Sequence, residues 1–142
     1  MKKTLEIILG FAKRREEHTA LQLKRLSAEL HKSQSFNDQV VSYIHEYEWQ
    51  MVEAAKKGTS VAYLQDSTSF RNRLHAGAIE QGQKIAGLDQ ASNQAKGLAV
   101  EAKLRVQGIE KVLARKHQEL LALRLKAEQR EQEDNLNSRL RG

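Results

Sequence analysis

The sequence predicts an all-α fold: an antiparallel two-helix coiled-coil hairpin in which helix 2 is longer than helix 1. Three observations predict it. The chain has no proline, its hydrophobic residues follow a heptad spacing, and it contains a single strong helix stop followed by a helix start. Average usage of about 5% would place roughly seven prolines in a chain of this length. Their absence allows long uninterrupted helices.

The helix stop and the following start lie in the stretch EAAKKGTSVAYLQ. Lys56 and Lys57 complement the negative end of a helix, and Gly58 can adopt the left-handed conformation that ends one. Thr59 or Ser60 can then cap the next helix. We therefore expect residues 1–142 to form a single coiled-coil rod, with helix 1 over about 3–57, a turn at 58–59, helix 2 over about 60–135 and a frayed C-terminal tail.

The heptad spacing continues through both predicted helices. Alternate steps of four and three residues from Leu5 to Ala54 give fifteen positions, of which eleven are apolar. The same steps from Leu64 to Ala127 give nineteen positions, of which fourteen are apolar. A heptad pattern of this length is typical of a coiled coil.

A tight turn at Gly58 makes the two helices antiparallel, so that facing seam residues have numbers that add to 118. This register pairs Leu5 with Leu113 at one end of the hairpin. It also places Asn37 opposite Gln81. Such a polar layer can fix the register of a coiled coil, although two solvated positions can also meet by chance.

The predicted helix 2 extends past the start of helix 1 by about 25 residues, or roughly 40 Å at the rise of an α-helix. This extension still carries four leucines that have no partner in the register, namely Leu120, Leu121, Leu123 and Leu125. We therefore expect an apolar surface on an unpaired helix.

Charge and aromatic residues separate along the predicted hairpin. The turn end (residues 33–85) has a net charge of −1, and the terminal end (residues 1–32 with 86–142) has +7. Of the seven aromatic residues, only Phe11 belongs to the terminal end. The others surround the turn: Phe36, Tyr43, Tyr47, Trp49, Tyr63 and Phe70. These aromatic side chains either form a docking patch or cover the seam and thicken the head of the hairpin.

The sequence contains little that indicates catalysis. It has no cysteine, no HExxH motif and no glycine-rich phosphate loop, and its five histidines are scattered. His45 and His75 could lie near each other across the hairpin, but two imidazoles make a weak zinc site. We therefore expect no enzymatic activity, no catalytic residue, no metal site and no cofactor.

Nucleic acids and membranes are also unfavoured as partners. The basic residues alternate with acidic ones, as in KRREE and REQED, which is typical of a solvated helix face. Aromatic residues for base stacking do not accompany them. No run approaches the ~20 apolar residues that span a bilayer. We expect no nucleic-acid binding and no direct membrane insertion.

Several spaced features resemble the flagellar export protein family FliJ, small coiled-coil components of the type III export ATPase complex. They are the opening LEIILGFAKRREE, the two tyrosines of SYIHEYEWQ, Gly58 at the turn, Phe70 and Leu74 in FRNRLHAGAIEQ, and the tail REQEDNLNSRL. The resemblance covers nearly the whole chain.

The resemblance implies a non-enzymatic, cytoplasmic protein at the flagellar base, similar to the central stalk of rotary ATPases. Its terminal end would enter the pore of the hexameric export ATPase (FliI) and promote assembly and activity of the ring. A patch near the turn would contact the cytoplasmic domain of the export gate protein (FlhA). The family is also associated with escorting export chaperones.

Residues carried over from the resemblance fall into two sets. The gate-binding candidates are Val40, Tyr43, Tyr47, Phe70 and Leu74. Three of them, Val40, Tyr47 and Leu74, lie in the predicted seam and have a partly structural role, so we expect Tyr43 and Phe70 to make the main contact. The ring-binding candidates are Leu5, Lys13, Arg14, Arg15, Leu120, Leu121, Leu123 and Leu125. The alternative functions are a virulence injectisome stalk, a generic coiled-coil scaffold or chaperone, and a basic nucleic-acid-binding rod.

Overall fold

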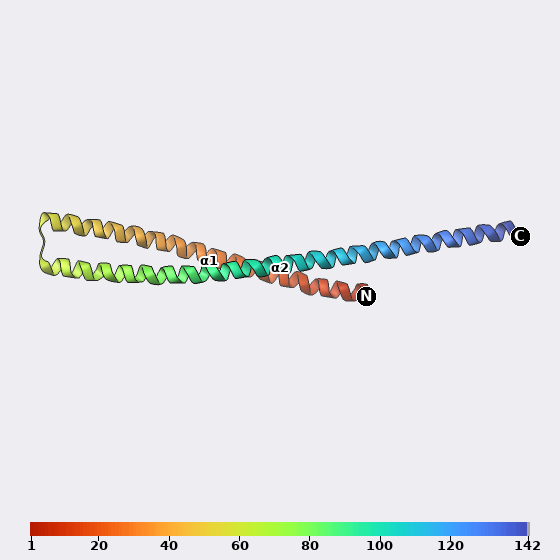
Figure 1. The fold of residues 1–142 in the computed structure, drawn as a ribbon, viewed down its shortest axis with the longest axis horizontal. Coiled ribbons are helices and arrows are strands. Elements are labelled where there is room, and N and C mark those ends of the chain that lie inside the picture. Colours follow the sequence, from red (N-terminus) through yellow and green to blue (C-terminus); the bar gives the residue numbers. More distant parts are fainter. Residues whose placement is uncertain (142) are drawn as a thin grey trace. The chain divides into compact units, whose positions relative to one another are not determined.

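The computed structural model describes residues 1–141 and contains two α-helices, α1 (Lys2–Lys57) and α2 (Val61–Arg141). The described range contains no strand, α2 is the longer helix, and the two helices pack against each other (Figure 1). The predicted fold class is therefore confirmed. Inter-residue contacts divide the chain into a turn unit, Thr19–Leu98, and a terminal unit, Met1–His18 with Ala99–Gly142.

The link between the helices lies in the turn unit and follows the expected chemistry. Gly58 has a φ of 83°, and its amide donates to the carbonyl oxygen of Ala55 at 3.3 Å. Glycine adopts this left-handed conformation without the steric penalty of a β-carbon. Ser60 is the residue that caps α2, because its hydroxyl accepts a hydrogen bond from the Tyr63 amide at 3.1 Å.

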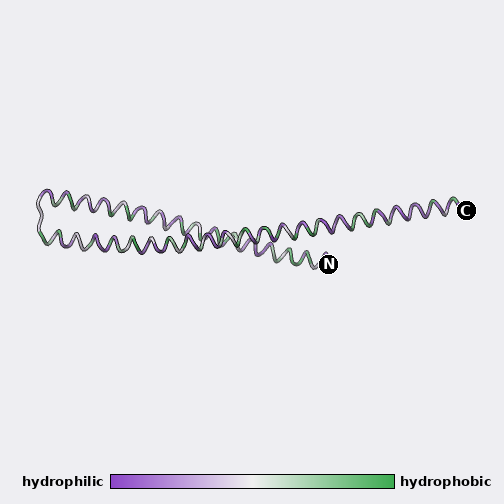
Figure 2. Tube along the Cα trace, in the orientation of Figure 1, coloured by the Kyte–Doolittle hydropathy of each residue, from purple (hydrophilic) through white to green (hydrophobic). Residues whose placement is uncertain are grey.

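Most of the residues that the heptad spacing placed in the seam are shielded. All fifteen seam positions of α1 are buried or half-buried. The first sixteen seam positions of α2, from Leu64 to Lys116, are also buried or half-buried, and the last three are exposed. Figure 2 shows the corresponding alternation of hydrophobic and hydrophilic residues along both helices. The seam therefore ends at Lys116.

The buried part of each unit is narrow and made largely of small side chains. The buried apolar residues are Ala12, Ala102 and Val106 in the terminal unit and Ile44 and Ala95 in the turn unit. Thr19, Ser33 and Ser67 are equally shielded. Each buried seam position contributes a large share of the apolar contact, because two helices enclose much less apolar surface than a globular core.

Polar groups also connect the two helices within the turn unit. Gln81 donates from Nε2 to the carbonyl oxygen of Ser33 at 3.5 Å, and the hydroxyls of Ser27 and Ser92 lie 3.5 Å apart. The predicted facing partner of Gln81 was Asn37; both are half-buried. The contact recorded for the Gln81 side chain is thus with the backbone of α1, one turn before Asn37.

In the terminal unit, α2 continues past Lys116 without shielding. Every residue from His117 to Arg141 is exposed. We call residues 117–141 the overhang. The helix extends beyond the end expected near residue 135. This is consistent with alternating acidic and basic residues and with the absence of proline from the segment, because such pairs support a solvated helix.

Candidate functional site: an aromatic patch and a leucine overhang

The aromatic patch comprises the five gate-binding candidates, Val40, Tyr43, Tyr47, Phe70 and Leu74, all in the turn unit. The rings of Tyr43 and Tyr47 stack with centroids 6.4 Å apart. The Phe70 ring meets Tyr47 edge-on at 5.1 Å. One continuous row of rings therefore runs from the surface of α1 to α2, since offset and edge-on contacts both stabilise aromatic pairs.

Exposure differs strongly among the patch residues. Tyr43 is 50% exposed, whereas Val40, Tyr47, Phe70 and Leu74 are half-buried. Phe36, which is 56% exposed, lies one heptad before Tyr43 on α1. Of the three aromatic residues that lie off the predicted seam, Phe36 and Tyr43 reach the surface, whereas Phe70 is half-buried. Tyr43 is therefore the patch member most available to a partner.

The surroundings of the patch carry both charge signs. The Arg73 guanidinium lies 5.8 Å from the centroid of the Phe70 ring, a cation–π arrangement. On the other side, a shallow groove of about 410 Å³ is lined by Asp38, Gln39, Ser42, Tyr43 and Glu46. A partner that covers Tyr43 therefore meets an acidic rim on α1.

A hydrogen bond between side chains connects the two helices close to the patch. The ring nitrogen Nε2 of His75 donates to Oε1 of Glu48 at 2.6 Å. This hydrogen bond, followed by the nearby positive charges, holds the pKa of the Glu48 carboxyl below its ordinary value of 4.5. The sequence suggested His45 as the residue near His75. Spacing along a seam does not specify which of two neighbouring polar side chains makes such a contact.

The ring-binding candidates near the start of α1 belong to the terminal unit. Leu5 is half-buried, while Lys13, Arg14 and Arg15 are exposed. The Arg14 guanidinium stacks 4.7 Å above the Phe11 ring, and its Nε donates to the Gly10 carbonyl oxygen at 3.4 Å. The cation of Arg14 is therefore held against an apolar surface.

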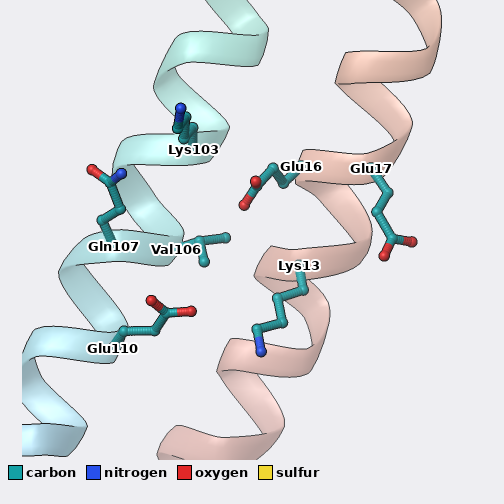
Figure 3. Close-up of a pocket in the computed structure, with 7 residues that line it drawn as sticks. All are labelled: Lys13, Glu16, Glu17, Lys103, Val106, Gln107 and Glu110. Carbon is teal, nitrogen blue, oxygen red and sulfur yellow. The ribbon is translucent and has the colours of Figure 1, made fainter.

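Two surface grooves lie beside this part of the terminal unit. The first, of about 430 Å³, is lined by Ile8, Phe11, Ala12, Arg15 and Arg105. The second, of about 340 Å³, is lined by Lys13, Glu16, Glu17, Lys103, Val106, Gln107 and Glu110. In Figure 3, Lys13 and Glu110 extend toward one another from opposite helices, and Val106 points between the helices. The mixed charges of the second groove fit a polar protein surface better than an anionic polymer.

The remaining ring-binding candidates are the leucines of the overhang. Leu120, Leu121, Leu123 and Leu125 are 44–64% exposed. Leu136 and Leu140 near the end of α2 are exposed as well. Apolar surface of this extent on a helix without a partner is typical of a binding site. Leu136 and Leu140 lie beyond residue 135, where the sequence predicts a frayed tail, so they were not among the predicted candidates.

The fold and these surfaces together define a class of protein. A helical hairpin that presents exposed rings in one unit and exposed leucines in the other has the features of a protein-binding module. Within residues 1–141, no group of three or more His, Asp or Glu side chains could hold a metal ion. Neither helix, over the same described range, has a stretch long and apolar enough to cross a membrane.

Residues 1–140 match the family model described as Flagellar FliJ protein. The chain therefore belongs to the FliJ family, a non-catalytic component of the flagellar type III export apparatus. No curated protein and no solved structure matches the chain.

Proposed function

We propose that the chain is a stalk that promotes assembly and activity of the hexameric export ATPase and couples it to the export gate. The observation that carries the proposal is the overhang, in which four leucines at 44–64% exposure lie on an unpaired helix. A single helix is about 10–12 Å wide with its side chains, narrower than the paired helices, so it suits the central pore of a ring. Family membership supports the same role.

The aromatic patch is the proposed contact with the cytoplasmic domain of the gate protein. Tyr43 supplies half-exposed aromatic surface, and aromatic residues are enriched at the centres of protein interfaces. Phe70 and Leu74 support the patch from α2. Export chaperones are further proposed partners, in keeping with the family resemblance.

The first test measures turnover and hexamer content of the export ATPase with and without the full chain. Stimulation together with more hexamer is the expected result. A chain lacking residues 118–142 should lose this effect and keep gate binding, because the shielded seam ends at Lys116. Unchanged stimulation by the folded truncated chain would contradict insertion of the overhang into the pore.

The second test addresses the gate. Phe70→Ala combined with Leu74→Ala should weaken gate binding and spare ATPase stimulation. Tyr43→Ala separates contact from folding, because Tyr43 lies off the seam and is 50% exposed. Trp49→Ala is a suitable control, since Trp49 is an aromatic residue of the same helix that is 63% exposed and lies outside the patch. Equal gate binding by the two single variants would argue against the patch.

A further inference from the structure

The exposed leucines of the overhang lie on two different faces of α2. At about 100° per residue, Leu121, Leu125, Leu136 and Leu140 fall within roughly 100° of the helix circumference. Leu120 and Leu123 point to the opposite side. All six side chains are exposed. The first four therefore form a separate apolar face, which we call the C-terminal leucine face.

The C-terminal leucine face has the same spacing in both directions along the chain. Its positions follow steps of four, four, three, four and four residues, namely Leu121, Leu125, Gln129, Gln132, Leu136 and Leu140. Among these six positions, residues equidistant from the centre have numbers that add to 261 and are identical in type; Ala122 and Arg139, at the edges of the same arc, also add to 261 but differ. A two-fold symmetric contact requires such self-complementarity, because the same patch must face itself in reverse. In this face, leucine meets leucine and glutamine meets glutamine.

The charges beside this face are also compatible with an antiparallel pair. Lys126 and Glu133 lie on the same flank, and their numbers add to 259. In an antiparallel pair, each Lys126 would thus lie about 3 Å along the axis from Glu133 of the second copy. Symmetry forms this opposite-charge pair twice, as in the flanking charges that select partners in coiled coils. The whole overhang carries five Lys or Arg and five Asp or Glu, so two copies do not repel through net charge.

We propose that the C-terminal leucine face binds a second copy of this chain as an antiparallel homodimer, a contact beyond the stalk function. The two copies together contribute eight leucines, four on each side of a central layer of glutamines, and the contact would shield all eight. The glutamine layer sets the register at some cost in stability. Leu121 and Leu125 are also ring-binding candidates. Self-association and ring binding therefore exclude each other at these side chains.

Sedimentation of the full chain over roughly a hundredfold concentration range tests the proposal. A dimer fraction that rises with concentration is expected. Leu125→Ser should weaken the dimer by about tenfold or more, because the change removes apolar contact on both copies. Leu123→Ser is the matched control, since both leucines are 64% exposed and only Leu125 lies on the face. A chain that stays monomeric, or equal loss from both variants, would overturn the proposal.

Orientation is tested by charge reversal. Lys126→Glu and Glu133→Lys should each weaken self-association, because each places like charges opposite one another twice. An equimolar mixture of the two variants should restore it, since both pairs then become attractive. Circular dichroism of each variant checks that the helix persists. A mixture that associates no better than its components contradicts the antiparallel register.

A cysteine experiment separates the two possible orientations, since the chain has no native cysteine. Leu121→Cys mixed with Leu140→Cys should form an intermolecular disulfide on oxidation, whereas either variant alone should not. In an antiparallel pair, two copies of residue 121 are separated by roughly 28 Å along the axis. Crosslinking of one variant with itself would instead indicate a parallel pair and overturn the proposal.

Discussion

The turn unit and the terminal unit are built from the same two helices but differ in how far their seam positions are shielded and in their net charge. In the turn unit, the seam positions of α1 and α2 are shielded from Thr19 to Leu98, and the charges nearly balance, with nine Lys or Arg and eight Asp or Glu. The terminal unit has fifteen and ten, and its seam ends at Lys116 while α2 continues to Arg141. Apolar heptad residues therefore stabilise the fold where a second helix faces them. Where no helix faces them, as at Leu120 and Leu123, they are exposed apolar surface.

The largest change in the free energy of unfolding is expected at Ile44, which is 4% exposed and is the least exposed apolar residue of the turn unit. Ile44→Ala should lower the free energy of unfolding by about 2–4 kcal/mol, through lost burial and a residual cavity. Leu123→Ala in the overhang should change it by less than about 0.5 kcal/mol. Urea unfolding followed by circular dichroism measures both. Similar values would mean that the overhang leucines are packed within the chain.

The seam of the terminal unit is tested by enlarging a buried side chain instead of shortening one. Ala102 is 6% exposed, so Ala102→Leu should destabilise this unit by about 1–3 kcal/mol through overpacking. Ala114→Leu introduces the same side chain at an exposed position of the same helix and is the control. Thermal unfolding compares the two variants. A neutral Ala102→Leu would show that the helices separate easily at this point.

Two glycines of the turn unit should respond with opposite signs. Gly58→Ala should cost about 1–2 kcal/mol, because φ at this position is 83° and an L-residue is strained there. Gly87→Ala should add about 1 kcal/mol, since the position is helical and a β-carbon would meet nothing within 4 Å. Thermal melts of both variants check the signs. Stabilisation by Gly58→Ala would contradict the left-handed turn.

The smallest expected effect concerns the Glu48–His75 contact. The folded-state pKa of Glu48 is lowered, so the contact contributes stability above a pH of about 4.5 and loses it as pH falls through the folded-state pKa. The difference in melting temperature between the native chain and Glu48→Gln should therefore shrink below about pH 4.5. Glu46→Gln is the charge-matched control. A difference independent of pH would argue against stabilisation by the ionised Glu48 carboxylate.

Much of the fold could be predicted from the sequence, because it depends on local signals. Heptad spacing predicted most of the shielded positions, and Gly58 followed by Thr59 or Ser60 predicted the turn, in which Ser60 is the cap. The contacts of Glu48 with His75 and of Gln81 with the Ser33 backbone could not be predicted. They depend on side-chain rotamers and on offsets of a few ångströms between helices, which hydrophobic spacing does not encode. For the candidate sites, exposure of Tyr43 and of the overhang leucines agreed with the register; their partners remain proposals.

The single tryptophan has a consequence for studies of binding. Trp49 is 63% exposed and lies two residues after Tyr47, on the other side of α1. A partner that covers only the Tyr43 side leaves the indole in water, and its fluorescence emission stays at long wavelength. A partner that encloses the helix shifts the emission to shorter wavelength. The intrinsic fluorescence of Trp49 therefore shows whether a bound protein contacts one side of α1 or encloses the helix.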